Sequence, residues 1–246
     1  VTFEGGTVEV DALVGRYVLI DDEKYLVEEI TSNTCVYCPY GTMILDKMKE
    51  LNKDLAIACI HGNLSGRDPF NSEECEQLFR YLYKGIDEGI AFPSGAFNRM
   101  YYGKEDGITP GIGYDPQYQD EIAEVLVDNL VNFSDPVFAS VDIETVLDSV
   151  NNKLKINVTG KGGEVAKDYL KKHSLTVYII EEGLKYRQNN LGVQDDNYIH
   201  KHVLRDVVTA INGDDINWTS SSEYSNTFTV DFNEKWNKDN VYVIAF

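Results

Sequence analysis

Two cysteines separated by two residues, Cys35 and Cys38, are the side chains of this sequence best placed for chemistry. They follow a strand-like run at residues 24–30 and precede a helix-like run at residues 40–51, so we expect them at a helix N-terminus. The unpaired amides and the macrodipole at that end favour negative charge, and this lowers a thiol pKa from its usual value of about 8.5. The spacing predicts a dithiol in which Cys35 is the reactive, exposed sulfur and Cys38 the protected one.

The same spacing is also typical of half a zinc site or of a structural disulfide. A zinc site needs two further ligands, and the remaining cysteines, Cys59 and Cys75, do not form a second pair of this kind. A structural disulfide between Cys35 and Cys38 needs nothing further from the sequence. The residues therefore favour a redox dithiol, with the structural disulfide as the main alternative.

The other candidate site residues have simpler interpretations. Cys59 lies in an apolar run, which predicts a buried side chain, whereas Cys75 lies between two glutamates and is predicted to be half exposed. His61 follows the apolar run and is expected to face water. His200 and His202 are expected on one face of a strand, but no third ligand is spaced to complete a metal site, so we predict no metal.

Composition excludes one large class of function. Acidic residues outnumber basic ones 41 to 22 in 246 residues, and the net charge of −19 argues against binding nucleic acid through its phosphates. No apolar run approaches the roughly 20 residues that span a bilayer. Val1 is not a natural translation start, so we expect that a leader has been removed.

Periodicity divides the chain near residue 134. Before this point, β-like pieces at residues 1–22 precede an alternation of apolar strands with amphipathic helices, which is typical of an α/β sheet. After Ser134-Asp135-Pro136, strands with alternating apolar and polar residues are separated by turns rich in Gly, Asn and Asp. This predicts an α/β domain at residues 1–134, with an N-terminal β extension, and an all-β sandwich of immunoglobulin-like type at residues 135–246.

The first part resembles the thioredoxin family. The resemblance rests on Cys35-Val36-Tyr37-Cys38-Pro39 at a strand-to-helix junction and on Phe92-Pro93 at the start of a later strand. It implies a thioredoxin-like fold, a cis peptide bond before Pro93 facing the dithiol, and a buried acid six residues before the first cysteine, where Glu29 stands. The tryptophan that usually precedes the first cysteine is replaced by Thr34.

The chain as a whole resembles the Omp28-related outer-membrane lipoproteins of Bacteroidetes, which join a thioredoxin-like domain to a C-terminal β-domain. The residues that carry this resemblance include Val177–Gly183, Gln188, Tyr198–Arg205 and Gly213, together with Phe97-Asn98-Arg99 in the first part. The resemblance implies an exported protein of the periplasm or outer membrane. It also implies a lipid anchor, attached where an N-terminal leader has been removed.

Together these features predict a thiol–disulfide oxidoreductase of the cell envelope. Cys35 would attack a disulfide, Cys38 would resolve the mixed disulfide, Glu29 would relay a proton and Pro93 would shape the binding groove. Such exchange uses protein thiols or disulfides as partners and requires neither an organic cofactor nor a metal. The alternative is a surface binding module, in which a non-catalytic thioredoxin scaffold supports a β-sandwich that contacts an envelope partner.

Overall fold

The computed structural model describes residues 2–3, 6–7, 24–84, 89–103, 107–134, 137, 139–163 and 166–246. The predicted N-terminal β extension lies almost wholly outside these residues. Its described part is a pair of short antiparallel strands, β1 (Thr2–Phe3) and β2 (Gly6–Thr7).

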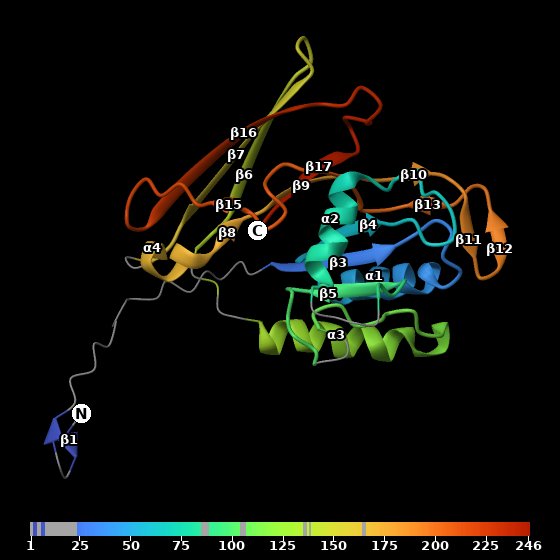
Figure 1. Ribbon diagram of the computed structural model, residues 1–246, viewed down its shortest axis with the longest axis horizontal. Helices are drawn as coiled ribbons and strands as arrows, with labels where there is room; N and C mark the ends of the chain where they lie inside the picture. Colours follow the sequence, from blue (N-terminus) through green and yellow to red (C-terminus); the bar gives the residue numbers. More distant parts are fainter. Residues whose placement is uncertain are drawn as a thin grey trace.

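A six-stranded sheet forms the centre of the molecule (Figure 1). Its strand order is β17-β9-β14-β4-β3-β5. The bounds are β3 (Tyr25–Thr31), β4 (Leu55–His61), β5 (Ser94–Phe97), β9 (Val177–Glu181), β14 (Val203–Val207) and β17 (Val241–Ala245). Strands β3 and β4 are parallel and nearly continuously buried, because both faces of the sheet are covered.

Helices cover both faces of the sheet over β3, β4 and β5. Helices α1 (Cys38–Leu51) and α3 (Gln119–Phe133) pack on one face, where they enclose a core that includes Val27, Ile57 and Met48. Helix α2 (Glu73–Leu82) packs on the opposite face. These three helices confirm the mixed α/β character predicted for the first part.

A three-stranded antiparallel sheet, in the order β16-β7-β6, extends away from the helices (Figure 1). Its strands are β6 (Asp142–Asp148), β7 (Lys153–Lys161) and β16 (Glu223–Asp231). Strand β7 alternates buried and exposed residues as its sequence predicts, and its apolar side chains pack with those of β9 and β17. The second part is therefore rich in strands, which belong to the six-stranded sheet, the three-stranded sheet and several two-stranded sheets. The immunoglobulin-like type stays a prediction.

Shorter elements connect these layers. They are η1 (Pro116–Tyr118), α4 (Ala166–Tyr169), η2 (Leu170–Lys172), β8 (Ser174–Leu175), β10 (Leu184–Lys185), β11 (Gln188–Asn190), β12 (Val193–Asp195), β13 (Ile199–His200) and β15 (Asp214–Asp215).

The central sheet contains strands from both sides of residue 134. Strand β14 pairs with β4 in parallel, and β9 pairs with both β14 and β17. Consecutive residues of β9 face different cores: Tyr178 packs on the α2 side and Ile179 packs against the three-stranded sheet. The division into domains at 134/135 stays a prediction, but the two segments share one hydrogen-bonded sheet.

We therefore expect the two segments to stay together when the chain is cut between them. A specific protease site inserted between Pro136 and Val137 should allow cleavage into two pieces that co-elute in size-exclusion chromatography and separate only in denaturant. The shared sheet and its two cores provide the reason, since apolar burial of this kind is the dominant stabilising term in folding. Separation of the pieces in native buffer would indicate independent domains.

Candidate functional site

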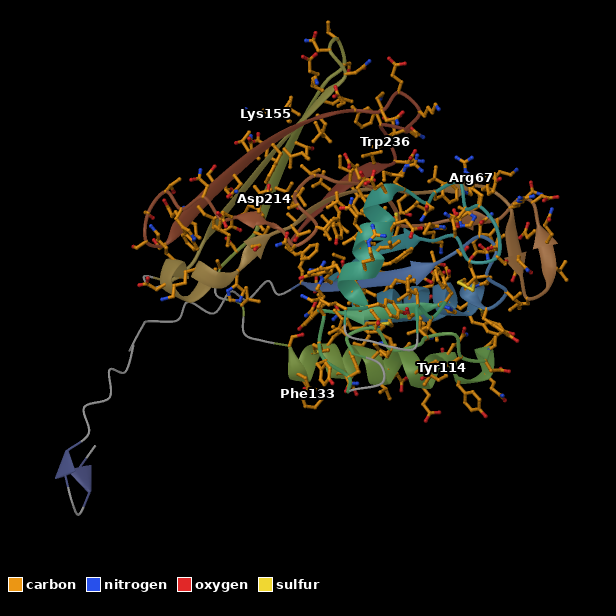
Figure 2. All side chains as sticks on the ribbon, viewed as in Figure 1. Arg67, Tyr114, Phe133, Lys155, Asp214 and Trp236 are labelled. Carbon is orange, nitrogen blue, oxygen red and sulfur yellow. A yellow bond between two sulfur atoms is a disulfide. The ribbon has the colours of Figure 1, made fainter. Side chains whose placement is uncertain are left out.

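The predicted dithiol is present as a disulfide between Cys35 and Cys38, with a Cα–Cα distance of 5.4 Å. It lies where β3 passes into α1, on the same side of the molecule as β11 and β12 (Figure 2). The helix begins at Cys38, so Cys35 precedes it in a tight loop in which its backbone N–H donates to the carbonyl of Ser32. Pro39 occupies the first turn, where a missing N–H costs no hydrogen bond.

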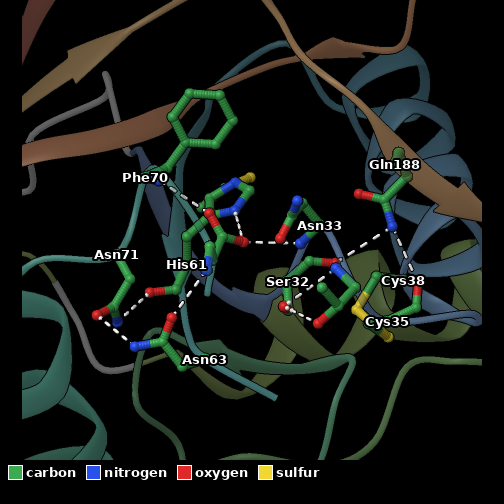
Figure 3. A network of polar contacts seen from close by, with 12 residues as sticks. Ser32, Asn33, Cys35, Cys38, His61, Asn63, Phe70, Asn71 and Gln188 are labelled. Atoms are coloured by element: carbon green, nitrogen blue, oxygen red, sulfur yellow. Dashed lines mark hydrogen bonds and ion pairs between the residues drawn. A yellow bond between two sulfur atoms is a disulfide. The ribbon is translucent and has the colours of Figure 1, made fainter. Parts of the chain in front are cut away.

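Both cysteines are 2% exposed, so the expectation of an exposed Cys35 is wrong for the disulfide form. The cover comes from a distant part of the chain (Figure 3). Gln188 donates its side-chain N–H groups to the carbonyls of Cys35 and Ser32, at 2.9 and 3.2 Å. The backbone of Asn189 donates to the carbonyl of Asn33 in the same loop. The segment 188–191 thus fastens the second part of the chain over the cysteine loop.

Glu29 is buried on β3, beside Cys59 in the parallel register of β3 and β4. The Cys59 thiol donates a hydrogen bond to Glu29 Oε2 at 3.0 Å, whereas Glu29 Oε1 has no hydrogen-bond partner in the part of the chain that the structure describes. Burial raises the pKa of Glu29 to about 7; the hydrogen bond from Cys59 opposes this shift and the charge of Asp46 adds to it. A carboxyl group with this pKa exchanges protons readily near neutral pH.

The free cysteines are both buried, Cys59 as predicted and Cys75 against the prediction. Cys75 packs with the core on the α2 side of the sheet, while Cys59 belongs to the core on the α1 side. The sheet separates the two thiols, which are not bridged. Burial raises the pKa of both, so each is a neutral thiol at physiological pH.

Pro93 follows a cis peptide bond, as the thioredoxin resemblance implied. It is buried next to α1: a Cβ on Gly41 would lie 2.9 Å from both Pro93 Cβ and Glu29 Oε1. A Cβ on Gly113 would likewise lie 2.9 Å from the Pro93 ring. Gly41 therefore allows α1 to approach both Glu29 and Pro93 closely, and Gly113 allows its own loop to approach Pro93.

A buried hydrogen-bonded pair, His61 and Asp68, supports the cysteine loop from the other side (Figure 3). Asp68 Oδ2 lies 2.9 Å from His61 Nδ1 and accepts the backbone N–H of Asn33 at 2.7 Å. Burial alone would raise the pKa of Asp68. The hydrogen bond and charge interaction with His61, together with hydrogen bonds from two backbone N–H groups, outweigh burial, so the pKa is lowered. His61 is buried, so the expectation that it faces water is wrong: its partner Asp68 and the rings of Phe70 and His200 enclose it.

A small cavity of about 20 Å³ joins these groups. Glu29, Cys38, Cys59 and His61 line it from the first part of the chain, and Gln188, Tyr198, His200, Lys201 and His202 line it from the second. His200 and His202 do not share a strand face as expected, because His202 has a φ of +53° and lies between β13 and β14. Within the described residues, no group of three or more His, Cys, Asp or Glu side chains is arranged to hold a metal.

The sequence-predicted residues Glu29 and Cys38 thus meet at one cavity, and Pro93 lies beside Glu29 and α1. Sequence reasoning missed the contributions of Gln188 and His200. Both residues lie in stretches that carry the Omp28-related resemblance, but no spacing connects them to the cysteines.

Comparison with known proteins supports the second resemblance. Residues 131–246 match the family described as outer membrane protein Omp28, which confirms the resemblance predicted for this part. Among solved structures, HBP35 of Porphyromonas gingivalis is similar with a TM-score of 0.69 and 18% identity, covering 91% of this chain and 68% of that chain. No curated protein matches the chain.

The family match indicates a protein of the bacterial envelope. At 18% identity, the similarity to HBP35 shows the fold alone. No helix among the described residues has the length and apolar character needed to cross a membrane.

Proposed function

We propose that the chain is a cell-envelope thiol–disulfide oxidoreductase that works through Cys35 and Cys38. The observation that carries the proposal is the buried Glu29, whose pKa is raised to about 7 and which lines the same cavity as Cys38. A proton donor and acceptor beside the inner sulfur is what opening and closing of a disulfide requires. The element order β3, cysteine pair, α1, β4, α2, Pro93, β5, α3 supports a thioredoxin-like assignment for residues 24–134.

The exchange proceeds in two balanced steps. In the reduced protein, the Cys35 thiolate attacks one sulfur of a substrate disulfide, and the other substrate sulfur leaves as a thiolate. Cys38 then loses its proton to Glu29 and attacks Cys35, which releases the second substrate thiolate and closes the Cys35–Cys38 bond. Two electrons pass to the substrate, and the same steps in reverse oxidise a substrate dithiol.

A second candidate is a binding module in which the disulfide is structural. The observation that favours it is the 2% exposure of both cysteines beneath segment 188–191. In this case the three-stranded sheet β16-β7-β6 would contact an envelope partner, with the first part as a scaffold.

Trapping of mixed disulfides distinguishes the two candidates. Reduced Cys38→Ser protein, incubated with an oxidised protein substrate such as insulin, should accumulate a covalent adduct through Cys35 that a reductant reverses. Cys35→Ser should give none, because Cys38 lies inward next to the cavity. If Cys38→Ser forms no adduct, and the wild-type disulfide resists dithiothreitol until the protein unfolds, the binding module is the correct description.

We also propose export to the periplasm or outer membrane with a lipid anchor on the mature N-terminus. The Omp28 match over residues 131–246 supports an envelope location. The lipid anchor goes beyond that match. Fatty-acid labelling of the protein expressed from its full gene tests it; membrane-free, unlabelled protein would contradict the anchor.

A further inference from the structure

Two side chains that line the cavity each have a buried polar atom with no hydrogen-bond partner among the described residues. These atoms are Glu29 Oε1 and His200 Nε2, and both side chains line the same space as Cys38. An unpaired buried polar atom costs about 1–3 kcal/mol, so native proteins satisfy such atoms with internal water where space allows. The cavity of about 20 Å³ has that space, since a single water requires roughly 10–15 Å³.

His200 is buried, and Nε2 of its ring has no hydrogen-bond partner among the described residues. In the neutral ring that carries its proton on Nδ1, Nε2 is an acceptor with a free lone pair. Burial lowers the pKa of His200 to about 4, and the charge interaction with nearby His61 adds to this shift. The ring is therefore neutral at physiological pH.

The other titratable groups at the cavity are already engaged. Cys59 donates to Glu29, His61 pairs with Asp68, and Tyr198 bonds to Thr42. The remaining ones are His202, which contacts Glu182 and Tyr242, and the ion pair of Asp46 and Lys201. Asp46 and Lys201 are 46% and 43% exposed, which marks the solvent side of the cavity.

We propose that His200 holds one water molecule between itself and Glu29, and that this water carries the proton between Glu29 and Cys38. The inference rests on the proposed redox function and adds a positioning residue from the Omp28 part of the chain. The water would donate one hydrogen bond to His200 Nε2 and one to Cys38 Sγ, and would accept one from protonated Glu29.

The proton transfer balances without another reactant. When an incoming thiolate opens the disulfide at Cys35, Cys38 leaves as a thiolate. The water passes one of its protons to Cys38 and takes the proton of Glu29, so the water is regenerated. Glu29 regains a proton from solvent on the side of Asp46 and Lys201, and closure of the disulfide reverses each step.

Two substitutions at His200 separate this role from packing. His200→Phe keeps an aromatic ring among Phe70, Tyr198 and His61 but removes the acceptor, whereas His200→Gln retains an acceptor near the position of Nε2. Tyr186→Phe is the matched control, because it removes the hydroxyl of a ring that packs on Phe70 but does not line the cavity. Near-ultraviolet circular dichroism of each variant reports whether the aromatic packing is kept.

The measurement is the rate of disulfide reduction by dithiothreitol at pH 5 to 9. A positioned proton donor contributes at least roughly a hundredfold, so His200→Phe should lose a tenfold or greater part of the rate below pH 7, together with the inflection near pH 7 that reports Glu29. His200→Gln should recover most of the rate and the inflection, and Tyr186→Phe should match the wild type.

Failure of this inference differs from failure of the proposed function. A wild-type disulfide that is reduced in the folded protein, with His200→Phe at the wild-type rate across the pH range, would overturn the role of His200 alone. Equal loss in His200→Phe and His200→Gln would also overturn it, since packing would then be responsible. A wild-type disulfide that is reduced only on unfolding would overturn both.

Discussion

Replacing Arg99 with methionine is expected to destabilise the protein by about 3–5 kcal/mol at neutral pH. Arg99 donates Nε–H and a terminal N–H to the two carboxylate oxygens of Glu28, at 2.7 and 2.8 Å. Glu28 is fully buried and also accepts the Tyr178 hydroxyl at 2.8 Å. Without Arg99, the buried carboxylate would lose its cation and keep only a neutral donor. The penalty comes from that uncompensated charge, because removal of one partner costs far more than the pair itself contributes.

Urea denaturation of three variants tests this account. Glu28→Gln combined with Arg99→Met should recover most of the stability that Arg99→Met loses, since no charge then remains buried. The control is Lys201→Met, which breaks the ion pair with Asp46 at 2.8 Å; this pair also joins the two parts of the chain, but both side chains are nearly half exposed. Its loss should cost at most about 1 kcal/mol. A double variant no more stable than Arg99→Met would contradict the charge explanation.

The elements around the cysteines could be predicted because their signals are local. An apolar run, a cysteine pair and an amphipathic helix each require only neighbouring residues to be recognised. Helix α2 also has such a local signal, which predicts that Cys75 is buried. Its residues Cys75, Leu78, Phe79 and Leu82 have the i, i+3, i+4, i+7 spacing of one buried face. This spacing, and not the flanking glutamates, decides that Cys75 is buried.

The joining of the two parts into one sheet could not be predicted from local patterns. Strand β9 is uniformly buried, and periodicity does not specify which strand lies beside it. The pairing of β14 with β4 brings Val203 opposite Cys59, and the segment before it then covers the disulfide. Two contacts at the site come from the second part of the chain: the His200 ring packs on His61, and Gln188 bonds to the carbonyl of Cys35.

Glu29→Gln is expected to change the pH dependence of stability more than any other single substitution at the site. In the folded protein the pKa of Glu29 is raised from 4.5 to about 7 by burial. Between these values the Glu29 carboxyl binds more protons in the folded state than in the unfolded state, so its contribution to stability is greatest below pH 4.5 and is lost as pH rises through 7. Each unit of pKa corresponds to about 1.4 kcal/mol, so the raised value costs the oxidised wild type about 3 kcal/mol at alkaline pH.

The difference in unfolding free energy between Glu29→Gln and wild type isolates this contribution, because the other titrating groups largely cancel. At pH 5 the two oxidised proteins should be about equally stable, apart from the changed bond with Cys59. At pH 8.5 the variant should be more stable by about 2–3 kcal/mol, because glutamine carries no charge that burial penalises. Glu121→Gln, on the exposed side of α3, should give a difference that does not change with pH. A pH-independent difference for Glu29→Gln would mean that Glu29 is already ionised at pH 5. It would then have no proton to give to Cys38 at neutral pH, and the proposed proton transfer would fail with it.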